Sequence, residues 1–214
     1  MMKKYTSDDI DVTYDHKKCI HAAVCVSRLG EVFDVKKRPW IQPEQASAER
    51  IAETVAACPS GALQFERHDG GEAESPPAKN VVVVTKDGPL YVSGKIVVEG
   101  IDGEVVAEGT RLALCRCGAS DNKPLCDNAH KNADFKAAST VTDNQEGTEE
   151  VAEMGELVVR LAKDGPLLLR GDFEVRDEGG TAVFRGQKAA LCRCGGSLNK
   201  PFCDGTHGQI GFEG

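Results

Sequence analysis

The stretch CRCGGSLNKPFCDGTH, from Cys192 to His207, places three cysteines and one histidine within 16 residues. Nearly the same stretch, CRCGASDNKPLCDNAH, runs from Cys115 to His130. A shift of 77 residues superposes the two copies without a gap, and about half of the positions from Lys86 to Phe135 are identical under this shift. Such self-similarity indicates a duplicated structural module.

The donor spacing in both copies, Cys-x-Cys-x8-Cys-x3-His, divides into two pairs. A Cys-x-Cys in a loop can bring both thiolates to one metal, and a Cys and a His four residues apart share one face of a helical turn. Two such pairs suit a two-iron cluster, and they also suit one tetrahedral zinc. Ordinary buried cysteines are disfavoured, because the same four positions recur. The predicted ligands are Cys115, Cys117, Cys126 and His130 in the first copy, and Cys192, Cys194, Cys203 and His207 in the second.

Each module begins with a β-rich stretch, NVVVVTKDGPLYVSGKIVVEG in the first copy and GELVVRLAKDGPLLLRGDFEV in the second. Its Asp-Gly-Pro lies between two apolar runs and therefore predicts a hairpin turn. The ligand stretch that follows is rich in Gly, Ser, Asn and Pro, which indicates a loop. After the third cysteine, Asp127 or Asp204 is expected to cap a short helix that carries the histidine.

The first 68 residues form a different, smaller domain. Ala48–Cys58 has helix-forming residues with apolar side chains at helical spacing, and the run that starts at Lys17 reads as a loop into a short helix ending at Gly30. Two polar stretches predict linkers. The resulting boundaries are residues 1–68 for the small domain, 69–80 for a linker, 81–140 for the first module, 141–154 for a second linker and 155–214 for the second module.

Composition restricts the function classes. The net charge of −8 argues against a nucleic-acid partner, since phosphate neutralisation needs a basic surface. The N-terminus lacks the apolar region of a signal peptide, and no apolar run is long enough to span a membrane, so we expect a cytoplasmic protein. Disulfides are disfavoured in that compartment, and the nine cysteines fall into three groups of three.

The ligand stretches resemble the motif of the CDGSH iron–sulfur domain family, the NEET proteins. In the second copy, Ser197, Pro201 and the run Cys203–His207 match this motif throughout; in the first copy, only Asn128 departs, standing where the motif has Gly. The resemblance implies a 2Fe–2S cluster in each module, held by three cysteines and the histidine. The family pairs two such modules in a homodimer, so the duplication implies an intramolecular pseudo-two-fold pair. The expected fold class is α+β, with a small ferredoxin-like domain before two β-rich modules.

The N-terminal group, Cys19, Cys25 and Cys58, resembles a divergent single-cluster ferredoxin domain. Such domains have C-x2-C-x2-C followed by a distant Cys-Pro, and here Cys58-Pro59 supplies the last element. Ala22 stands at the middle position and cannot ligate iron. Three cysteines imply a 3Fe–4S cluster, with two alternatives: a 4Fe–4S cluster whose fourth iron takes water, an external ligand or His21, or a site that is empty or holds zinc.

Other residues have less specific roles. His16 and His68 are expected at the surface, and Trp40 is expected to pack the small domain. Arg116 and Arg193, inside the Cys-x-Cys pairs, are expected either to tune a cluster or to lie at the surface.

Three functions compete. The first is one-electron transfer through three clusters, with redox proteins as partners. The second is cluster storage, transfer to apo iron–sulfur acceptors, or redox sensing through labile His-ligated clusters. The third is a zinc-bound structural module. No nucleotide loop or nucleophile–base set is visible, so we expect an electron carrier rather than an enzyme, and a monomer because the pairing is internal.

Overall fold

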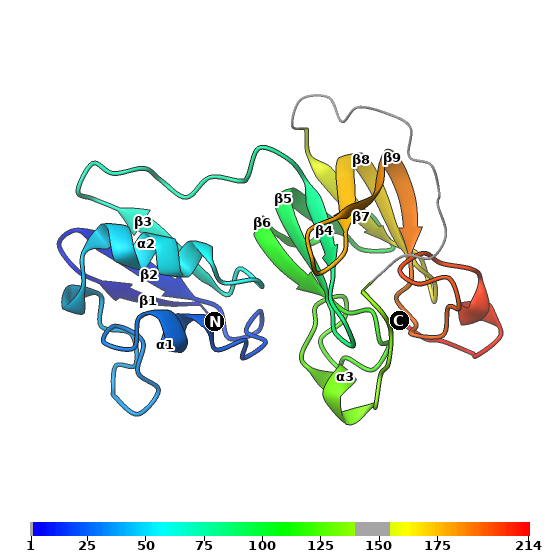
Figure 1. Cartoon of the computed structure of the whole chain (residues 1–214), viewed down its shortest axis with the longest axis horizontal. Coiled ribbons are helices and arrows are strands. Elements are labelled where there is room, and N and C mark those ends of the chain that lie inside the picture. Colours follow the sequence, from blue (N-terminus) through cyan, green and yellow to red (C-terminus); the bar gives the residue numbers. More distant parts are fainter. Residues whose placement is uncertain (1, 140–154) are drawn as a thin grey trace. The chain divides into compact units, whose positions relative to one another are not determined.

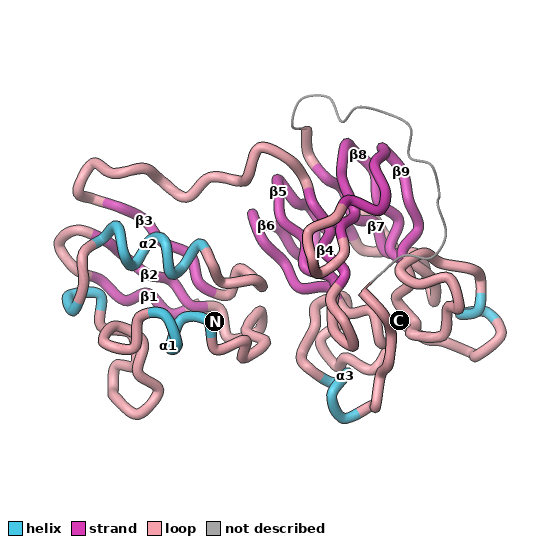
Figure 2. Tube along the Cα trace, viewed as in Figure 1, coloured by secondary structure: helices cyan, strands magenta, loops and turns pink. Residues whose placement is uncertain are grey.

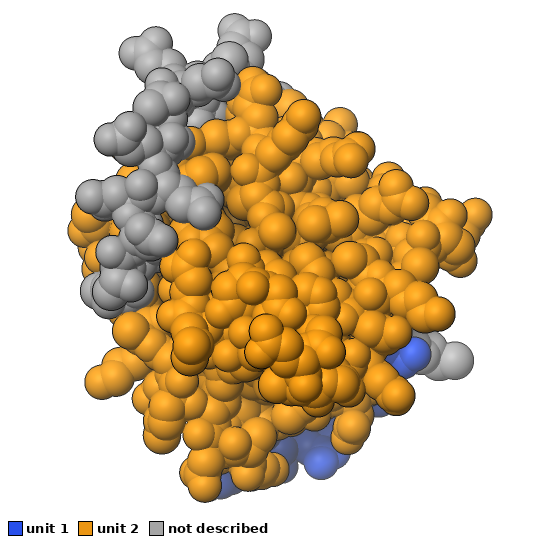
Figure 3. Space-filling model, turned by 90° about the vertical axis from the view of Figure 1, so that its right-hand side faces the viewer, with its two compact units in different colours: residues 1–75 blue, residues 76–214 orange. Residues whose placement is uncertain are grey.

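The computed structural model describes residues 2–139 and 155–214, and the predicted linker 141–154 lies outside the described residues. The chain forms two compact units, Met1–Ser75 and Pro76–Gly214 (Figures 1 and 3). Helices and sheets are both present, as Figure 2 shows, so the class is α+β. Among the described residues, no helix is long and apolar enough to cross a membrane.

The first unit is a three-stranded antiparallel sheet with two helices. Strands β1 (Lys3–Thr6), β2 (Ile10–Tyr14) and β3 (Leu63–Arg67) pair in the order β1-β2-β3. Between β2 and β3 the chain forms α1 (Val24–Arg28), the 3-10 helix η1 (Pro43–Gln45) and α2 (Ala48–Ala56). The side chain of Ser47 caps α2 by accepting a hydrogen bond from the Arg50 amide.

The core of the first unit lies between α2 and the sheet. Ile51 and Val55 of α2 are fully buried and belong to one apolar cluster with Ile10 and Val12 of β2. As predicted, Trp40 packs this unit. Its ring contacts three other aromatic rings, with centroids 6.5 Å from Tyr5, 5.0 Å from Tyr14 and 6.2 Å from Phe33.

The second unit contains two copies of a three-stranded antiparallel arrangement. The first copy consists of β4 (Val81–Val84), β5 (Leu90–Glu99) and β6 (Val105–Leu114). The second consists of β7 (Leu157–Leu161), β8 (Leu167–Arg176) and β9 (Ala182–Leu191). The predicted Asp-Gly-Pro hairpins join β4 to β5 and β7 to β8, and Asp87 and Asp164 take positive φ angles of 51° and 47° there.

The two copies exchange strand pairings. β4 pairs in parallel with β8, and β7 pairs in parallel with β5. The two parallel pairings have the same register. Val81 lies opposite Glu174, and Val158 lies opposite Val97, which are the positions related to them by the 77-residue shift. The first strand of each module therefore also pairs with the middle strand of the other module. The strands of both modules enclose one shared apolar core.

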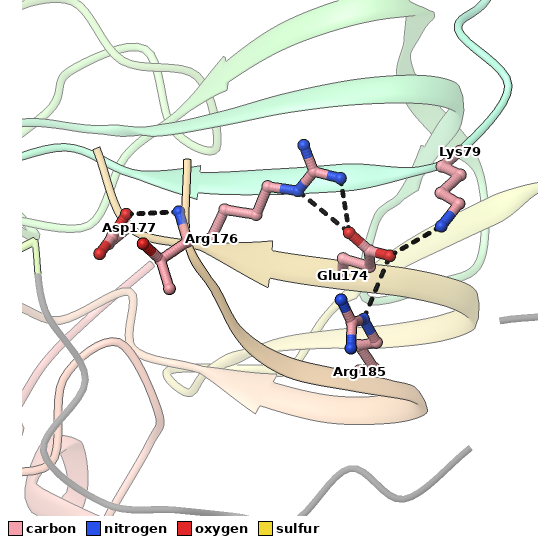
Figure 4. A network of polar contacts seen from close by, with 6 residues as sticks. Lys79, Glu174, Arg176, Asp177 and Arg185 are labelled. Carbon is pink, nitrogen blue, oxygen red and sulfur yellow. Dashed lines mark hydrogen bonds and ion pairs between the residues drawn. The ribbon is translucent and has the colours of Figure 1, made fainter. Parts of the chain in front are cut away.

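A buried carboxylate strengthens one of these junctions. Glu174 on β8 is 1% exposed, and Figure 4 shows three cations around it. Lys79 Nζ lies 3.0 Å from its carboxylate, Arg176 Nη2 2.6 Å and Arg185 Nε 3.3 Å. Burial alone would raise the pKa of Glu174, but the hydrogen bonds from Arg176 and Lys79 lower it to about 2.

Candidate metal centres

The first ligand loop brings its four predicted donors together as two pairs. Cys115 and Cys117 follow the end of β6, and their Sγ atoms are 3.7 Å apart. Cys126 lies in the loop before α3 (Ala129–Asn132), which carries His130. The Sγ of Cys126 is 3.5 Å from His130 Nδ1, so Nδ1 is the ring nitrogen on the ligand side.

The second loop repeats this geometry. The Sγ atoms of Cys192 and Cys194 are 3.8 Å apart, and Cys203 Sγ is 3.4 Å from His207 Nδ1. His207 lies on the short 3-10 helix η2 (Thr206–Gly208). Two sulfurs bound to one metal at about 2.3 Å in tetrahedral geometry are about 3.8 Å apart. Each pair is therefore already spaced to share one metal.

Side chains inside each loop fix the donors. Ser120 Oγ donates to the Leu125 carbonyl at 2.7 Å. Asp127 accepts from the Asp121 amide at 2.8 Å and from the amide of Ala129, the first residue of α3, at 2.9 Å. Ser197 and Asp204 make the equivalent bonds in the second loop. The predicted aspartate caps are wrong in position: the N-cap residues are Asn128 and Gly205, which make no side-chain cap hydrogen bond, and each aspartate instead accepts from the first amide of the short helix.

The Asn that departs from the motif preserves the backbone turn. Asn128 has φ 74° and ψ 6°, and Gly205 at the matching position has φ 86° and ψ −2°. Both are left-handed conformations, which Asn tolerates better than most residues. The substitution therefore leaves Cys126 and His130 in the same arrangement as Cys203 and His207.

The thiols of the first loop are electrostatically coupled. The hydrogen bond between the two thiols lowers the pKa of Cys115 to about 6, despite burial, and raises that of Cys117. Burial raises the pKa of Cys126 to about 11. The loop therefore carries thiol protons at neutral pH that metal binding must displace.

The third group of cysteines lines a cavity of the first unit. Cys19 follows β2, Cys25 lies in α1 and Cys58 follows α2, and all three line one cavity of about 620 Å³. Burial raises the pKa of Cys25, and the neighbouring charges of Cys58 and Cys19 add to this effect. Ala22 lines the same cavity and offers no donor, while His21 lines it with a positive φ of 50°.

His68 lies at the surface, as predicted, with 39% of its side chain exposed, and it contacts an acidic residue of the small sheet. Its Nε2 is 2.9 Å from Asp11, and with Glu66 these residues place three donor atoms within 4.8 Å of one another. Lys4 Nζ lies 2.7 Å from Asp11 and 3.3 Å from Glu66. An ammonium group therefore already occupies the position that a cation would take.

Comparison with known proteins assigns these loops. A family model described as "Iron-binding zinc finger CDGSH type" matches residues 87–131 and again residues 164–208. A second model, "Divergent 4Fe-4S mono-cluster", matches residues 5–68. The chain therefore combines a divergent mono-cluster domain with two CDGSH iron-binding modules. With its two CDGSH modules and its mono-cluster domain, it is an iron–sulfur protein.

Two curated relatives match part of the chain. The chain is 38% identical over 64 residues to the uncharacterized protein YjdI of Escherichia coli strain K12, and equally to that of Escherichia coli O157:H7. The match covers 30% of this chain and 83% of each relative. No solved structure matches significantly.

Each CDGSH module contains a buried arginine, which corrects the expected surface position. Arg116 and Arg193 are both 1% exposed. Arg116 donates to the carbonyls of Thr85, Gly88 and Ala138, and its guanidinium lies 5.2 Å from the Phe135 ring centroid. Arg193 likewise donates to Ala162, Gly165 and Gly214, and lies over Phe212. These arginines tie the Cys-x-Cys segment to the hairpin turn. The sequence signal for this buried contact is the recurrence of the arginine and of the phenylalanine at matching positions of the two modules.

The two CDGSH loops also touch each other. Cys117 and Cys194 form an isolated antiparallel backbone bridge, and both loops lie at one end of the sheet (Figure 1). The next residues are Gly118 and Gly195, both with φ 81°. A Cβ at either one would lie 2.5 Å from the carbonyl oxygen of the opposite cysteine. Only glycine permits this close approach.

Proposed function

We propose that this chain is a three-cluster, one-electron carrier. Each CDGSH loop would hold a 2Fe–2S cluster through three cysteines and the Nδ1 of His130 or His207. Cys19, Cys25 and Cys58 would hold a 3Fe–4S cluster, or a 4Fe–4S cluster with a fourth, non-cysteine ligand. The observation that carries the proposal is the division of both CDGSH donor sets into pairs 3.4–3.8 Å apart. When bound, such clusters supply reversible one-electron chemistry.

The proposal includes an intramolecular pseudo-two-fold pair of CDGSH modules. The corresponding registers of β4 with β8 and of β7 with β5 support it. So does the Cys117–Cys194 bridge, because a two-fold axis would map each of these residues onto the other. One chain would then supply both halves of the pair, and a monomer would suffice. Size-exclusion chromatography with light scattering tests the monomer, and a dimer mass would contradict it.

Electron transfer is preferred over catalysis because the chain offers direct contact between cluster loops. The cavity of the mono-cluster domain is lined by the three cysteines that we propose as cluster ligands, which supports a redox role for this domain. The expected partners are redox proteins, with neither nucleic acid nor membrane involved.

Cluster transfer or redox sensing is the second candidate, and the exposure of His207 favours it. His207 is partly buried, whereas His130 is buried, with 8% of its surface exposed. Protonation of an accessible ligand histidine releases its metal, which would make the second cluster transferable.

Iron and sulfide quantitation with EPR tests the proposal on protein purified without oxygen. About seven irons per chain fits a three-iron N-terminal cluster, and about eight fits a four-iron cluster. The 2Fe–2S centres become paramagnetic on reduction, whereas a 3Fe–4S centre is paramagnetic when oxidised. Colourless protein that contains zinc but no sulfide would overturn the iron–sulfur assignment.

Mixing the loaded protein with an apo-ferredoxin separates the two candidates. Reversible reduction without transfer of iron and sulfide supports the electron carrier. Rapid transfer to the apo-ferredoxin instead supports a storage or delivery role.

A further inference from the structure

The cavity of the mono-cluster domain is larger than the cluster it would hold. Its volume is about 620 Å³. A cluster of four irons and four sulfides has eight heavy atoms. At about 30 Å³ per atom, the share of one water in the liquid, it fills about 240 Å³. More than half of the cavity is left, enough for a small organic molecule.

The cavity also lacks a cysteine for one corner of a four-iron cluster. Ala22 occupies the position between Cys19 and Cys25 where the related pattern has a third cysteine, and it lines the cavity. Its methyl group cannot bind iron. A donor at this corner must therefore come from a neighbouring side chain or from a molecule in the remaining volume.

The charges around the cavity favour an anion. Lys3 and Arg38 line it, and none of its described lining residues is acidic, although the chain has a net charge of −8. Arg38 Nη1 donates to the carbonyls of Val35 at 3.0 Å and Lys37 at 2.7 Å. These bonds hold the guanidinium at the rim and use only part of its donor set. A guanidinium so placed matches a carboxylate.

The wall that faces this volume is apolar and aromatic. Trp40 and Tyr14 both line the cavity, and their rings meet edge to face with centroids 5.0 Å apart. Cys19 lines the same cavity as Tyr14, so this wall adjoins a proposed cluster ligand. Tyr5 extends the wall, with its ring centroid 6.5 Å from that of Trp40. An occupant with an apolar body and one negative group fits this combination.

We propose that the cavity binds a small carboxylate with an apolar body beside the cluster. The carboxylate would pair with Arg38 and Lys3 and would approach the corner left by Ala22, while the body would lie against Trp40. The inference rests on the proposed cluster in this domain. No bond is made or broken beyond coordination.

Benzoate titration of the loaded protein tests the proposal, with benzyl alcohol as the uncharged control. Trp40 is the only tryptophan, so its fluorescence reports on this cavity alone. We expect a saturable fluorescence change and an altered EPR spectrum of the N-terminal cluster with benzoate, and neither with benzyl alcohol. Equal responses to both compounds, or none to benzoate, would overturn the proposal.

Charge variants test the contacts. Arg38→Gln should weaken benzoate binding about tenfold, the loss expected for one charged hydrogen bond. Lys36→Gln is the matched control, because Lys36 lies in the same exposed loop but does not line the cavity. Equal affinities for the two variants would count against the anion site.

Ala22→Cys tests the position of the carboxylate. A cysteine at the open corner should abolish the EPR response to benzoate. If Ala22→Cys holds four irons in this domain and its EPR spectrum still responds to benzoate, the carboxylate does not lie at the corner left by Ala22. Iron and sulfide quantitation on the same sample identifies a failure of the cluster assignment separately, since fluorescence still reports benzoate binding when the cluster is missing.

Discussion

Cys117 and Cys194 face each other across a two-residue antiparallel bridge, and the glycine after each lies against the other's carbonyl. This contact joins the two ligand loops directly. It makes each CDGSH loop part of the support of the other.

Gly118→Ala should therefore destabilise both CDGSH loops. Its Cβ would lie 2.5 Å from the Cys194 carbonyl oxygen, so the bridge must open. Gly103→Ala is the matched control: Gly103 also has positive φ, 90°, but a Cβ there meets nothing within 4 Å. We expect about 1 kcal/mol loss for Gly103→Ala from backbone strain and at least about 3 kcal/mol for Gly118→Ala. Urea unfolding and visible absorbance measure both; equal losses would contradict the role of the bridge.

Arg116→Lys should shorten the lifetime of the first cluster. A lysine cannot reach three carbonyls at once, which leaves buried carbonyls without donors and costs about 2–3 kcal/mol. Arg160→Lys is the control, because Arg160 is exposed on β7. The decay of visible absorbance in air gives the lifetimes. A variant as durable as the control would show that the arginine does not position the loop.

The Glu174 network predicts an acid-dependent loss of stability. The pKa of Glu174 is depressed from 4.5 to about 2, so its contribution is complete above pH 4.5 and disappears as the pH falls toward 2. Glu174→Gln should cost about 2 kcal/mol at pH 7, and this difference from the wild type should vanish near pH 2. Urea unfolding followed by circular dichroism at both pH values measures it. Glu156→Gln, at a half-exposed site 3.7 Å from Lys95, should change stability by less than about 0.5 kcal/mol.

His207→Cys should lower the potential of the second cluster and make that cluster more durable. A thiolate replaces a neutral imidazole, and it adds negative charge that opposes reduction. Redox titration followed by EPR measures the potential of each cluster. His68→Gln, remote from the CDGSH modules in sequence, should leave both potentials unchanged. An unaltered second potential in His207→Cys would remove His207 from the ligand set.

The local features of this fold follow from the sequence, whereas the long-range ones do not. The Asp-Gly-Pro hairpins, the short helices after Cys126 and Cys203 and the packing of Trp40 depend on turn chemistry and on spacing within a few residues. The parallel pairing of β4 with β8 and of β7 with β5 depends on which exposed strand edges meet. A repeat of 77 residues does not specify that choice.

The candidate sites show the same division. The donor pairs could be predicted because each is adjacent in the chain. The burial of Arg116 could not, since its carbonyl partners come from the hairpin turn and from the segment after α3. The cavity around Cys19 likewise depends on Trp40 and Arg38, which lie in a loop with no recognisable motif.

The covalent joining of the CDGSH modules has a consequence for how their properties can diverge. In an assembly of two identical chains, every substitution occurs twice, so both sites must change together. Here position 97 is valine where position 174 is glutamate, and His207 is more exposed than His130. Mutation can adjust one site while its neighbour keeps its original chemistry, and a single gene can encode two centres of unequal reactivity.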